Sequence, residues 1–273
     1  GENIAQDSAP TPKVRESKQG LELTVEGQGK VFRLTLPSEG LTAGTVHITT
    51  PDGASLVGQR LLPSGVMPHG PKGAELMERW DASYRRDQLP GWDVGRPCTH
   101  LAKAVEEKTF KPGRAIVLGC GSGTNAIYLA RKGFEVTGVD VSPSALAIAA
   151  RKSVEAGVQV DWVLADVVAL PKLEPYSLIF DRGCYHHICQ YDSPAYVETL
   201  RRLSKSGSRA MVLAGSPVDG NRGGPPRIAE ATIRKDFTAL FDFEWLQNIH
   251  FDTRNPNTKG PSAWSIHLRR KSN

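Results

Sequence analysis

The segment AIVLGCGSGTNAIYLA, residues 115–130, constrains the fold of this chain more than any other. It opens with a continuous apolar run, typical of a buried strand, and ends in a helix-forming stretch. Between the two, Gly119, Gly121 and Gly123 allow a sharp backbone turn and the close approach of a ligand. The first N–H groups of the following helix have no partner inside that helix, so they are available to a bound group. The segment therefore predicts a strand, a ligand-binding loop and a helix in direct succession.

A carboxylate in the next strand fits the same site. Asp140 ends the segment EVTGVD, 21 residues beyond Gly119, where an acidic side chain can accept hydrogen bonds from both hydroxyls of a ribose. The alternative is an acid that interacts with the N-terminal dipole of the helix capped by Ser142. A dinucleotide-binding loop would have glycine at the position of Thr124, which disfavours a dinucleotide oxidoreductase. We expect Asp140 to bind the ribose of a different cofactor.

From residue 74 onward, helical and strand patterns alternate. The predicted helices cover 74–86, 99–108, 124–132, 143–157, 194–204 and 228–241. The predicted strands cover 115–119, 135–140, 160–166, 177–181, 208–215, 243–249 and 263–269. Repeated strand–helix units predict an α/β fold with a seven-stranded, doubly wound parallel sheet and a ligand site at the carboxyl ends of its strands.

The first 73 residues differ in composition from the rest. Residues 1–20 are polar and rich in Pro, Ser, Gln and Lys, which predicts a disordered lead-in. Residues 21–62 alternate apolar and polar positions between turn residues, which predicts a small antiparallel β unit of about four strands and of unknown role. Residues 63–73 hold three Pro and three Gly and are the predicted linker. The β unit is a candidate interface with a partner chain, and the oligomeric state stays open.

Composition excludes several classes of protein. No apolar run approaches the roughly 20 residues that a membrane-spanning helix needs, so we expect no membrane partner. The net charge of +5 is modest and dispersed, so we expect no nucleic-acid partner. Four cysteines without a CxxC pair predict neither a disulfide framework nor a zinc ribbon. We expect a cytoplasmic protein, although the polar start at Gly1 also fits a cloning scar or the remainder after removal of a signal peptide.

Four segments occur in an order that resembles one enzyme family: PGWDVGRP at 90–97, the glycine loop with the strand that follows it, FDRGCYHHI at 180–188 and GGPPRIAEATIRKDF at 223–237. Together they resemble the class I S-adenosylmethionine-dependent methyltransferases, and within these the thiopurine S-methyltransferase and tellurite-resistance methyltransferase group. The resemblance covers about residues 78–270 and leaves out the β unit. It implies that residues 74–273 form a Rossmann-like methyltransferase domain with S-adenosylmethionine as its cofactor.

The resemblance also implies roles for single residues. It places Trp92 beside the cofactor, and Asp166 and the backbone around Val167 beside the adenine. Asp181, which ends the strand SLIFD, joins the expected cofactor-binding set together with the three glycines and Asp140. Arg182 faces the reacting methyl group and is the expected catalytic residue.

Each of these assignments has a structural alternative. Trp92 is equally well interpreted as a core tryptophan. Asp166 would cap a loop, and Arg182 would form an ion pair with Asp181 or Glu198 that fixes its loop. Trp80, in the preceding helix, is a weaker candidate for closing over the site.

The cluster Cys184, His186, His187 and Cys189 does not have the spacing of a known metal site, so we expect no metal. These residues are interpreted as buried packing and a wall of the substrate pocket. A histidine acting as proton acceptor is a further possibility, because imidazole titrates near neutral pH. Cys120, inside the glycine loop, is interpreted as a small apolar filler and not as a nucleophile.

The predicted function is transfer of a methyl group to a small-molecule acceptor with a soft nucleophile: a thiol, a thiopurine-like compound, a selenium or tellurium species, or a halide. One alternative is a non-catalytic sensor that binds the cofactor and uses the β unit for interaction. Another is a nucleic-acid methyltransferase, disfavoured because FDRGCYHH stands where amino-directed enzymes have an Asn/Asp-Pro-Pro-aromatic stretch.

Overall fold

The computed structural model describes residues 13–17, 20–27, 30–37, 45–49, 55–61, 70–86, 88–170, 172–219 and 224–272. Predictions for the other positions, including most of the lead-in and most of the linker, lie outside the described residues. The chain divides into two compact units, Gly1–Gly65 and Val66–Asn273, and each is described by itself. None of the helices in the described ranges has the length and apolar character needed to cross a membrane.

The N-terminal unit is an antiparallel sheet in which each strand pairs with its neighbours in sequence. Its strands are β1 (Lys13–Ser17), β2 (Gly20–Gly27), β3 (Lys30–Pro37), β4 (Thr45–Thr49) and β5 (Ser55–Leu61). Strand β1 lies within the segment predicted to be disordered. Its sequence KVRES is polar and was therefore not recognised as a strand, but at the edge of a sheet backbone pairing with β2 is sufficient. Within the described ranges, the β unit thus begins earlier than predicted, at Lys13, and has five strands.

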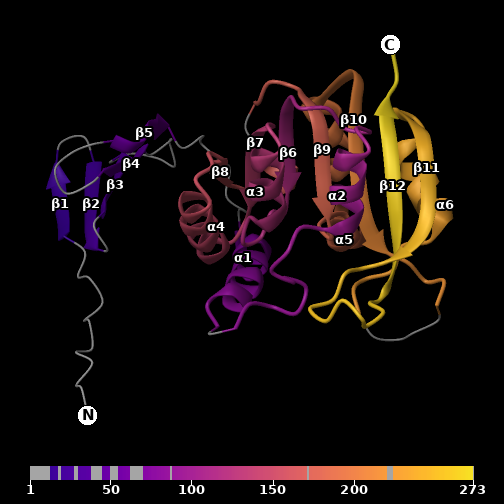
Figure 1. Cartoon of the computed structure of the whole chain (residues 1–273), viewed down its shortest axis with the longest axis horizontal. Helices are drawn as coiled ribbons and strands as arrows, with labels where there is room; N and C mark the ends of the chain where they lie inside the picture. The colour runs from indigo at the N-terminus through magenta and orange to yellow at the C-terminus, as the bar shows by residue number, and fades with distance from the viewer. Residues whose placement is uncertain are drawn as a thin grey trace. The chain divides into compact units, whose positions relative to one another are not determined.

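The C-terminal unit contains a seven-stranded sheet in the order β11-β12-β10-β9-β6-β7-β8, as Figure 1 shows. Its strands are β6 (Arg114–Leu118), β7 (Glu135–Asp140), β8 (Asp161–Leu164), β9 (Tyr176–Arg182), β10 (Ser204–Gly215), β11 (Phe241–His250) and β12 (Ser262–Arg270). The α/β class and the number of strands are confirmed.

The sheet is mixed and not parallel throughout, which corrects the prediction. Strands β6 to β10 run parallel to one another, whereas β12 is antiparallel to both β10 and β11. Residues 251–261 alone connect β11 to β12, and a connection of that length is too short for the helical crossover that parallel neighbours require.

The strand order reverses between β6 and β9. From β6 the chain continues through β7 and β8 toward one edge, and it then returns to the other side of β6 with β9 and β10. The carboxyl ends of β6 and β9 therefore lie side by side at the point where the connections diverge. In open α/β sheets this is where ligands bind.

The helices are α1 (Gly70–Tyr84), α2 (Thr99–Glu106), α3 (Thr124–Arg131), α4 (Pro143–Glu155), α5 (Tyr185–Leu203) and α6 (Glu230–Phe237), with a 3₁₀ turn η1 (Val167–Ala169). Helix α4 begins as predicted: the Ser142 hydroxyl accepts a hydrogen bond from the N–H of Ala145 at 3.0 Å.

Two helices begin earlier than the sequence predicted. Helix α1 starts at Gly70, so the last residues of the predicted linker are helical; a proline in the first turn of a helix is favourable. Helix α5 starts at Tyr185, where only residues 194–204 were expected. Its backbone breaks at Asp192, with φ −155° and ψ 65°, and resumes at Pro194. Pro194 thus begins the second part of a kinked helix.

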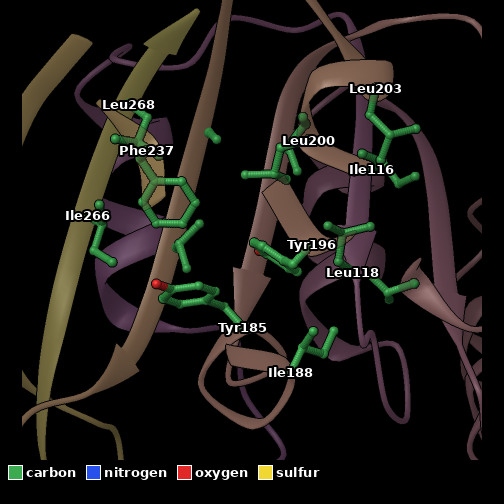
Figure 2. Close-up of a cluster of buried hydrophobic side chains, with 14 of the residues drawn as sticks. Ile116, Leu118, Tyr185, Ile188, Tyr196, Leu200, Leu203, Phe237, Ile266 and Leu268 are labelled. Carbon is green, nitrogen blue, oxygen red and sulfur yellow. The ribbon is translucent and has the colours of Figure 1, made fainter. Parts of the chain in front are cut away.

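Apolar side chains pack on both faces of this sheet. On β6, Ile116 and Leu118 pack toward α5 and α6, whereas Ala115 and Val117 pack toward α2 and α3. Figure 2 shows the first layer, where Ile116 and Leu118 lie in the same cluster as side chains of α5. Burial on both faces explains why β6 reads as an uninterrupted apolar run.

Candidate active site

A cavity of about 1080 Å³ lies at the carboxyl ends of the parallel strands. Its wall is formed by the glycine loop, by α1, by residues 91–96, by the ends of β7 and β9, and by residues 251–253. This volume is at the upper end of the roughly 300–1,000 Å³ of pockets that hold drug-sized ligands. The cavity therefore has room for a nucleoside cofactor and a small second substrate together.

The glycine loop is fixed to the end of β7 by Asp140. The N–H of Gly121 donates to Oδ2 of Asp140 at 2.8 Å, and the N–H of Ser142 donates to Oδ1 at 2.9 Å. Gly121 has φ +54°, and a Cβ there would lie 2.5 Å from the Tyr84 hydroxyl. Only glycine fits this position, because both the backbone conformation and the contact with Tyr84 exclude a side chain.

Asp140 also lines the cavity, so a ribose-binding role stays a prediction beside its contacts at the start of α4. Its side chain is buried, and burial raises its pKa above the ordinary value. The N–H groups of Gly121 and Ser142 each bond one oxygen of this carboxylate, and each oxygen can accept more than one hydrogen bond.

Two predicted cofactor residues, Gly123 and Asp181, do not line the cavity. At Gly123, with φ +79°, a Cβ would lie 2.6 Å from the Trp162 ring and 2.7 Å from Ala149 Cβ. The role of Gly123 is therefore to let the start of α3 pack closely against Trp162 and Ala149. Asp181 is fully buried, and its carboxylate accepts hydrogen bonds from the N–H groups of Cys184 and Tyr185 at 2.8 and 2.9 Å.

The Tyr196 hydroxyl donates to the same carboxylate at 2.6 Å, so Asp181 anchors the first turn of α5 and does not line the cavity. Burial raises the pKa of Asp181 to about 6. The sequence could not separate the two roles, because a strand-ending acid looks the same whether it faces the cavity or the helix behind it.

Asp166 and Val167 both lie at the cavity, as the resemblance implied. Oδ1 of Asp166 also accepts the N–H of Val168 at 3.1 Å and so caps η1, which was the structural alternative. Burial raises the Asp166 pKa. The Thr199 hydroxyl donates to the carbonyl of Val167 at 3.0 Å and fixes the backbone there.

An aromatic wall closes one side of the cavity. Trp92 is 47% exposed, so the interpretation as a core tryptophan is wrong. Its Nε1 donates to the Tyr84 hydroxyl at 3.1 Å. The Trp80 ring packs edge-to-face against Trp92, with centroids 5.8 Å apart, and against His187, at 4.6 Å. Trp80 therefore does line the site.

Tyr84 was missed by the sequence analysis, as was the attachment of its helix. Asp81, one turn earlier on α1, accepts hydrogen bonds from the Ser142 hydroxyl at 2.7 Å and from the Ser144 N–H at 2.8 Å. These bonds fasten α1 to the start of α4. No motif marks either residue, and only their position on a predicted helix before the glycine loop could have drawn attention to them.

Arg182 binds backbone carbonyls on two loops. Its Nη1 donates to the carbonyl of Trp92 at 3.0 Å and its Nη2 to that of Asp252 at 3.5 Å. The guanidinium carbon lies 5.3 Å from the centre of the Phe251 ring. The predicted alternative partner Glu198 instead pairs with Arg201 at 2.6 Å. The structure thus places Arg182 at the cavity wall, between the loop 90–97 and the loop 251–261.

Further bonds join these two loops. Nη2 of Arg96 donates to the carbonyl of Thr253 at 2.7 Å, and Nη2 of Arg254 donates to the carbonyl of Pro90 at 3.1 Å. The loop 251–261 was missed as part of the site. It lies there because β11 runs parallel to β10, so that its carboxyl end reaches the same edge of the sheet.

Both histidines at the cavity are poor bases. Burial, the neighbouring His187 and the charge of Arg182 lower the pKa of His186 to about 3. Burial and Arg79 lower the pKa of His187 to about 4. Burial also raises the pKa of the Cys120 and Cys184 thiols, which disfavours them as nucleophiles.

Removal of the Asp181 carboxylate should cost stability and not cofactor affinity. In Asp181→Ala the two backbone N–H groups and the Tyr196 hydroxyl lose their acceptor, so the free energy of unfolding should fall by roughly 2–4 kcal/mol. The affinity for S-adenosylhomocysteine should stay within about threefold of the wild type. Urea titration and calorimetry measure the two quantities, with Asp242→Ala, an exposed carboxylate on β11, as the matched control. A large loss of affinity at unchanged stability would restore Asp181 to the cofactor site.

Comparison with known proteins identifies the class. A family model described as a methyltransferase domain matches residues 115–207. The chain is 30% identical over 183 residues to thiocyanate methyltransferase 1 of Arabidopsis thaliana, covering 66% of this chain and 80% of that protein. It is 29% identical to probable thiol methyltransferase 2 of the same plant, covering 54% of this chain and 65% of that protein, just under two thirds of its length.

Among solved structures, the N-methyltransferase NodS of Bradyrhizobium japonicum in complex with S-adenosyl-L-homocysteine shares the fold. Its TM-score is 0.58 at 14% identity, with 72% of this chain and 98% of that chain covered. Fold, glycine loop and relatives agree, and the chain belongs to the class I S-adenosylmethionine-dependent methyltransferases. Within that class it is similar to the thiol and thiocyanate methyltransferases.

The residues present fit the cofactor of this family. The backbone approaches the cavity closely at Gly121, where no side chain is tolerated, and the carboxylate of Asp140 lines the cavity. Asp166 and Val167 follow at the end of β8, on the same edge of the sheet. Gly121 would contact the part of the cofactor next to the glycine loop, and Asp140 would hold the ribose. Asp166 and Val167 would hold the adenine.

Proposed function

We propose that this methyltransferase acts on a small soft nucleophile: a thiol, a thiopurine-like heteroaryl thiol, a selenium or tellurium species, or a halide or pseudohalide such as thiocyanate. The observation that carries the proposal is the chemistry of the cavity beyond Asp140. A guanidinium, Arg182, lies there with two histidines whose pKa values are about 3 and 4.

Such a site suits an acceptor that needs no strong base. Alcohol and amine acceptors must lose a proton during or after the attack, and a catalytic base works best when its pKa lies near the working pH. His186 and His187 are far below that range. Thiocyanate and halides are anions with no proton to lose, and acidic thiols are already ionised at neutral pH. The names of the relatives, thiol and thiocyanate methyltransferases, support the same class of acceptor.

The bound cofactor supplies a methyl group on a positively charged sulfonium. The contribution of the chain is therefore alignment and exclusion of water. Asp140 fixes the ribose, Trp80 and Trp92 close one side of the cavity, and Arg182 stands where an anionic acceptor would be attracted. Arg182 cannot act as a base, because its guanidinium stays charged at any usable pH.

Cofactor binding and acceptor choice are tested separately. S-adenosylhomocysteine should raise the thermal midpoint and NAD should not, because a ligand that binds only the native state stabilises it. In a methyl-transfer assay, kcat/KM for thiocyanate, iodide or a heteroaryl thiol should exceed that for a phenol or an amine of similar size by about 100-fold or more. Comparable rates with the phenol or the amine would contradict the proposal. Binding of S-adenosylhomocysteine without turnover of any acceptor would favour the sensor alternative.

A further inference from the structure

His186 is a buried polar side chain whose role the proposed function leaves open. It is 3% exposed and lines the cavity from the first turn of α5. Its Nδ1 accepts the backbone N–H of Gly215, at the end of β10, at 3.0 Å. Among the residues that the structure describes, none forms a hydrogen bond with its Nε2.

The bond to Gly215 decides where the proton of this imidazole lies. A backbone N–H can only donate, so Nδ1 must offer its lone pair and carry no hydrogen. The low pKa of His186 keeps the ring neutral near pH 7, and a neutral ring with a bare Nδ1 carries its single proton on Nε2. His186 therefore presents an N–H donor and not a base.

His186 and Arg182 both contact Phe251. The His186 ring packs edge-to-face against Phe251, with centroids 6.1 Å apart, and the Arg182 guanidinium lies over the same ring at 5.3 Å. Nε2 itself lies next to Gly183: a Cβ added to Gly183 would be 3.5 Å from His186 Nε2. Gly183 lines the cavity as well, so a side chain at this position would compete for the space in front of Nε2.

We propose that His186 donates its Nε2–H to the methyl acceptor, so that His186 and Arg182 together bind an acceptor anion. This inference rests on the proposed function and adds the second binding group. The acceptor brings its own lone pair, which forms the new bond to the methyl carbon as the carbon–sulfonium bond breaks. The products are then neutral and no proton has to move, which fits a histidine that donates without titrating.

The test separates the two nitrogens of the ring. In His186→Asn the amide oxygen can still accept the Gly215 N–H, whereas the donor at the Nε2 position is lost. With the protein saturated with S-adenosylhomocysteine, the Kd of thiocyanate measured by calorimetry should rise about tenfold or more, as expected when a hydrogen bond to an anion is lost. The Kd of S-adenosylhomocysteine should not change. His250→Asn is the matched control, because its Nδ1 also bonds a backbone group, the Gly260 carbonyl, and it does not line the cavity.

The outcomes distinguish this inference from the proposed function. An unchanged thiocyanate Kd in His186→Asn, or no thiocyanate binding by the wild type, would overturn the inference. If the wild type binds thiocyanate through His186 but methylates no soft nucleophile, the proposed function fails and the binding role stands. If His186→Asn does not fold, the inference can be tested on the wild type alone. The ¹⁵N chemical shifts of the His186 imidazole should show the Nε2–H tautomer. An Nδ1–H tautomer or an imidazolium at pH 7 would overturn the inference.

Discussion

Asp140→Ala should raise the Kd of S-adenosylhomocysteine by about 100-fold or more. This carboxylate lines the cavity, where the two hydroxyls of a ribose would donate to it, and a hydrogen bond to a charged group contributes roughly 1.5–3 kcal/mol. Loss of two such bonds corresponds to a factor of at least about 100 in affinity. Isothermal calorimetry on the purified variant measures the change directly.

Asp140→Ala should also lower the free energy of unfolding. The N–H groups of Gly121 and Ser142 lose their acceptor, at roughly 1–3 kcal/mol for each buried donor. Thermal unfolding must therefore accompany the calorimetry. Asp242→Ala, outside the cavity, should leave both quantities unchanged. Wild-type affinity in Asp140→Ala would sink the assignment of Asp140 to the cofactor.

Arg182→Ala should lower kcat/KM for thiocyanate by about 100-fold, because it removes the fixed positive charge at the acceptor end of the cavity. The affinity for S-adenosylhomocysteine should fall by only a few-fold, through the lost bonds to the carbonyls of Trp92 and Asp252. Arg182→Lys should recover part of the activity, since it restores the charge but not the planar pair of donors. Steady-state kinetics with acceptor and cofactor varied in turn separate the two effects.

The pH dependence provides a second criterion for Arg182. If the guanidinium favours the ionised form of a weakly acidic thiol, the loss of activity in Arg182→Ala should be greatest at pH values below the pKa of that thiol. If cofactor affinity and thermal stability fall together while acceptor kinetics stay unaltered, Arg182 only supports the two loops.

The sequence predicted well those helices and strands whose residue pattern has only one structural explanation. Strand β6 is buried on both faces, so its apolar run is unambiguous, and Ser142 with Pro143 marks the start of α4. The strands β11 and β12 were recognised individually, but their antiparallel pairing was missed. The short connection between them requires that pairing, and with it the position of the loop 251–261 at the cavity.

The site was predicted less completely than the fold. Asp140 and Arg182 end parallel strands and Asp166 follows β8, so their position along the chain fixes their position at the site. Asp181 precedes the last residue of β9, yet its carboxylate lies behind the sheet edge against α5. Strand alternation separates neighbours such as Asp181 and Arg182, but only packing shows which of the two faces the cavity. Tyr84 and Phe251 have no sequence signal, because tertiary contacts alone bring them to the cavity.

The bonds that join the loops 90–97 and 251–261 have a consequence for how this enzyme can change. Arg96, Arg182 and Arg254 all hold main-chain carbonyls, which every amino acid provides. Apart from these arginines, the side chains of the two loops can therefore vary while the bonds between the loops persist. Selection, or a mutagenesis library restricted to positions such as Thr253, can reshape the acceptor pocket without separating the segments that enclose it.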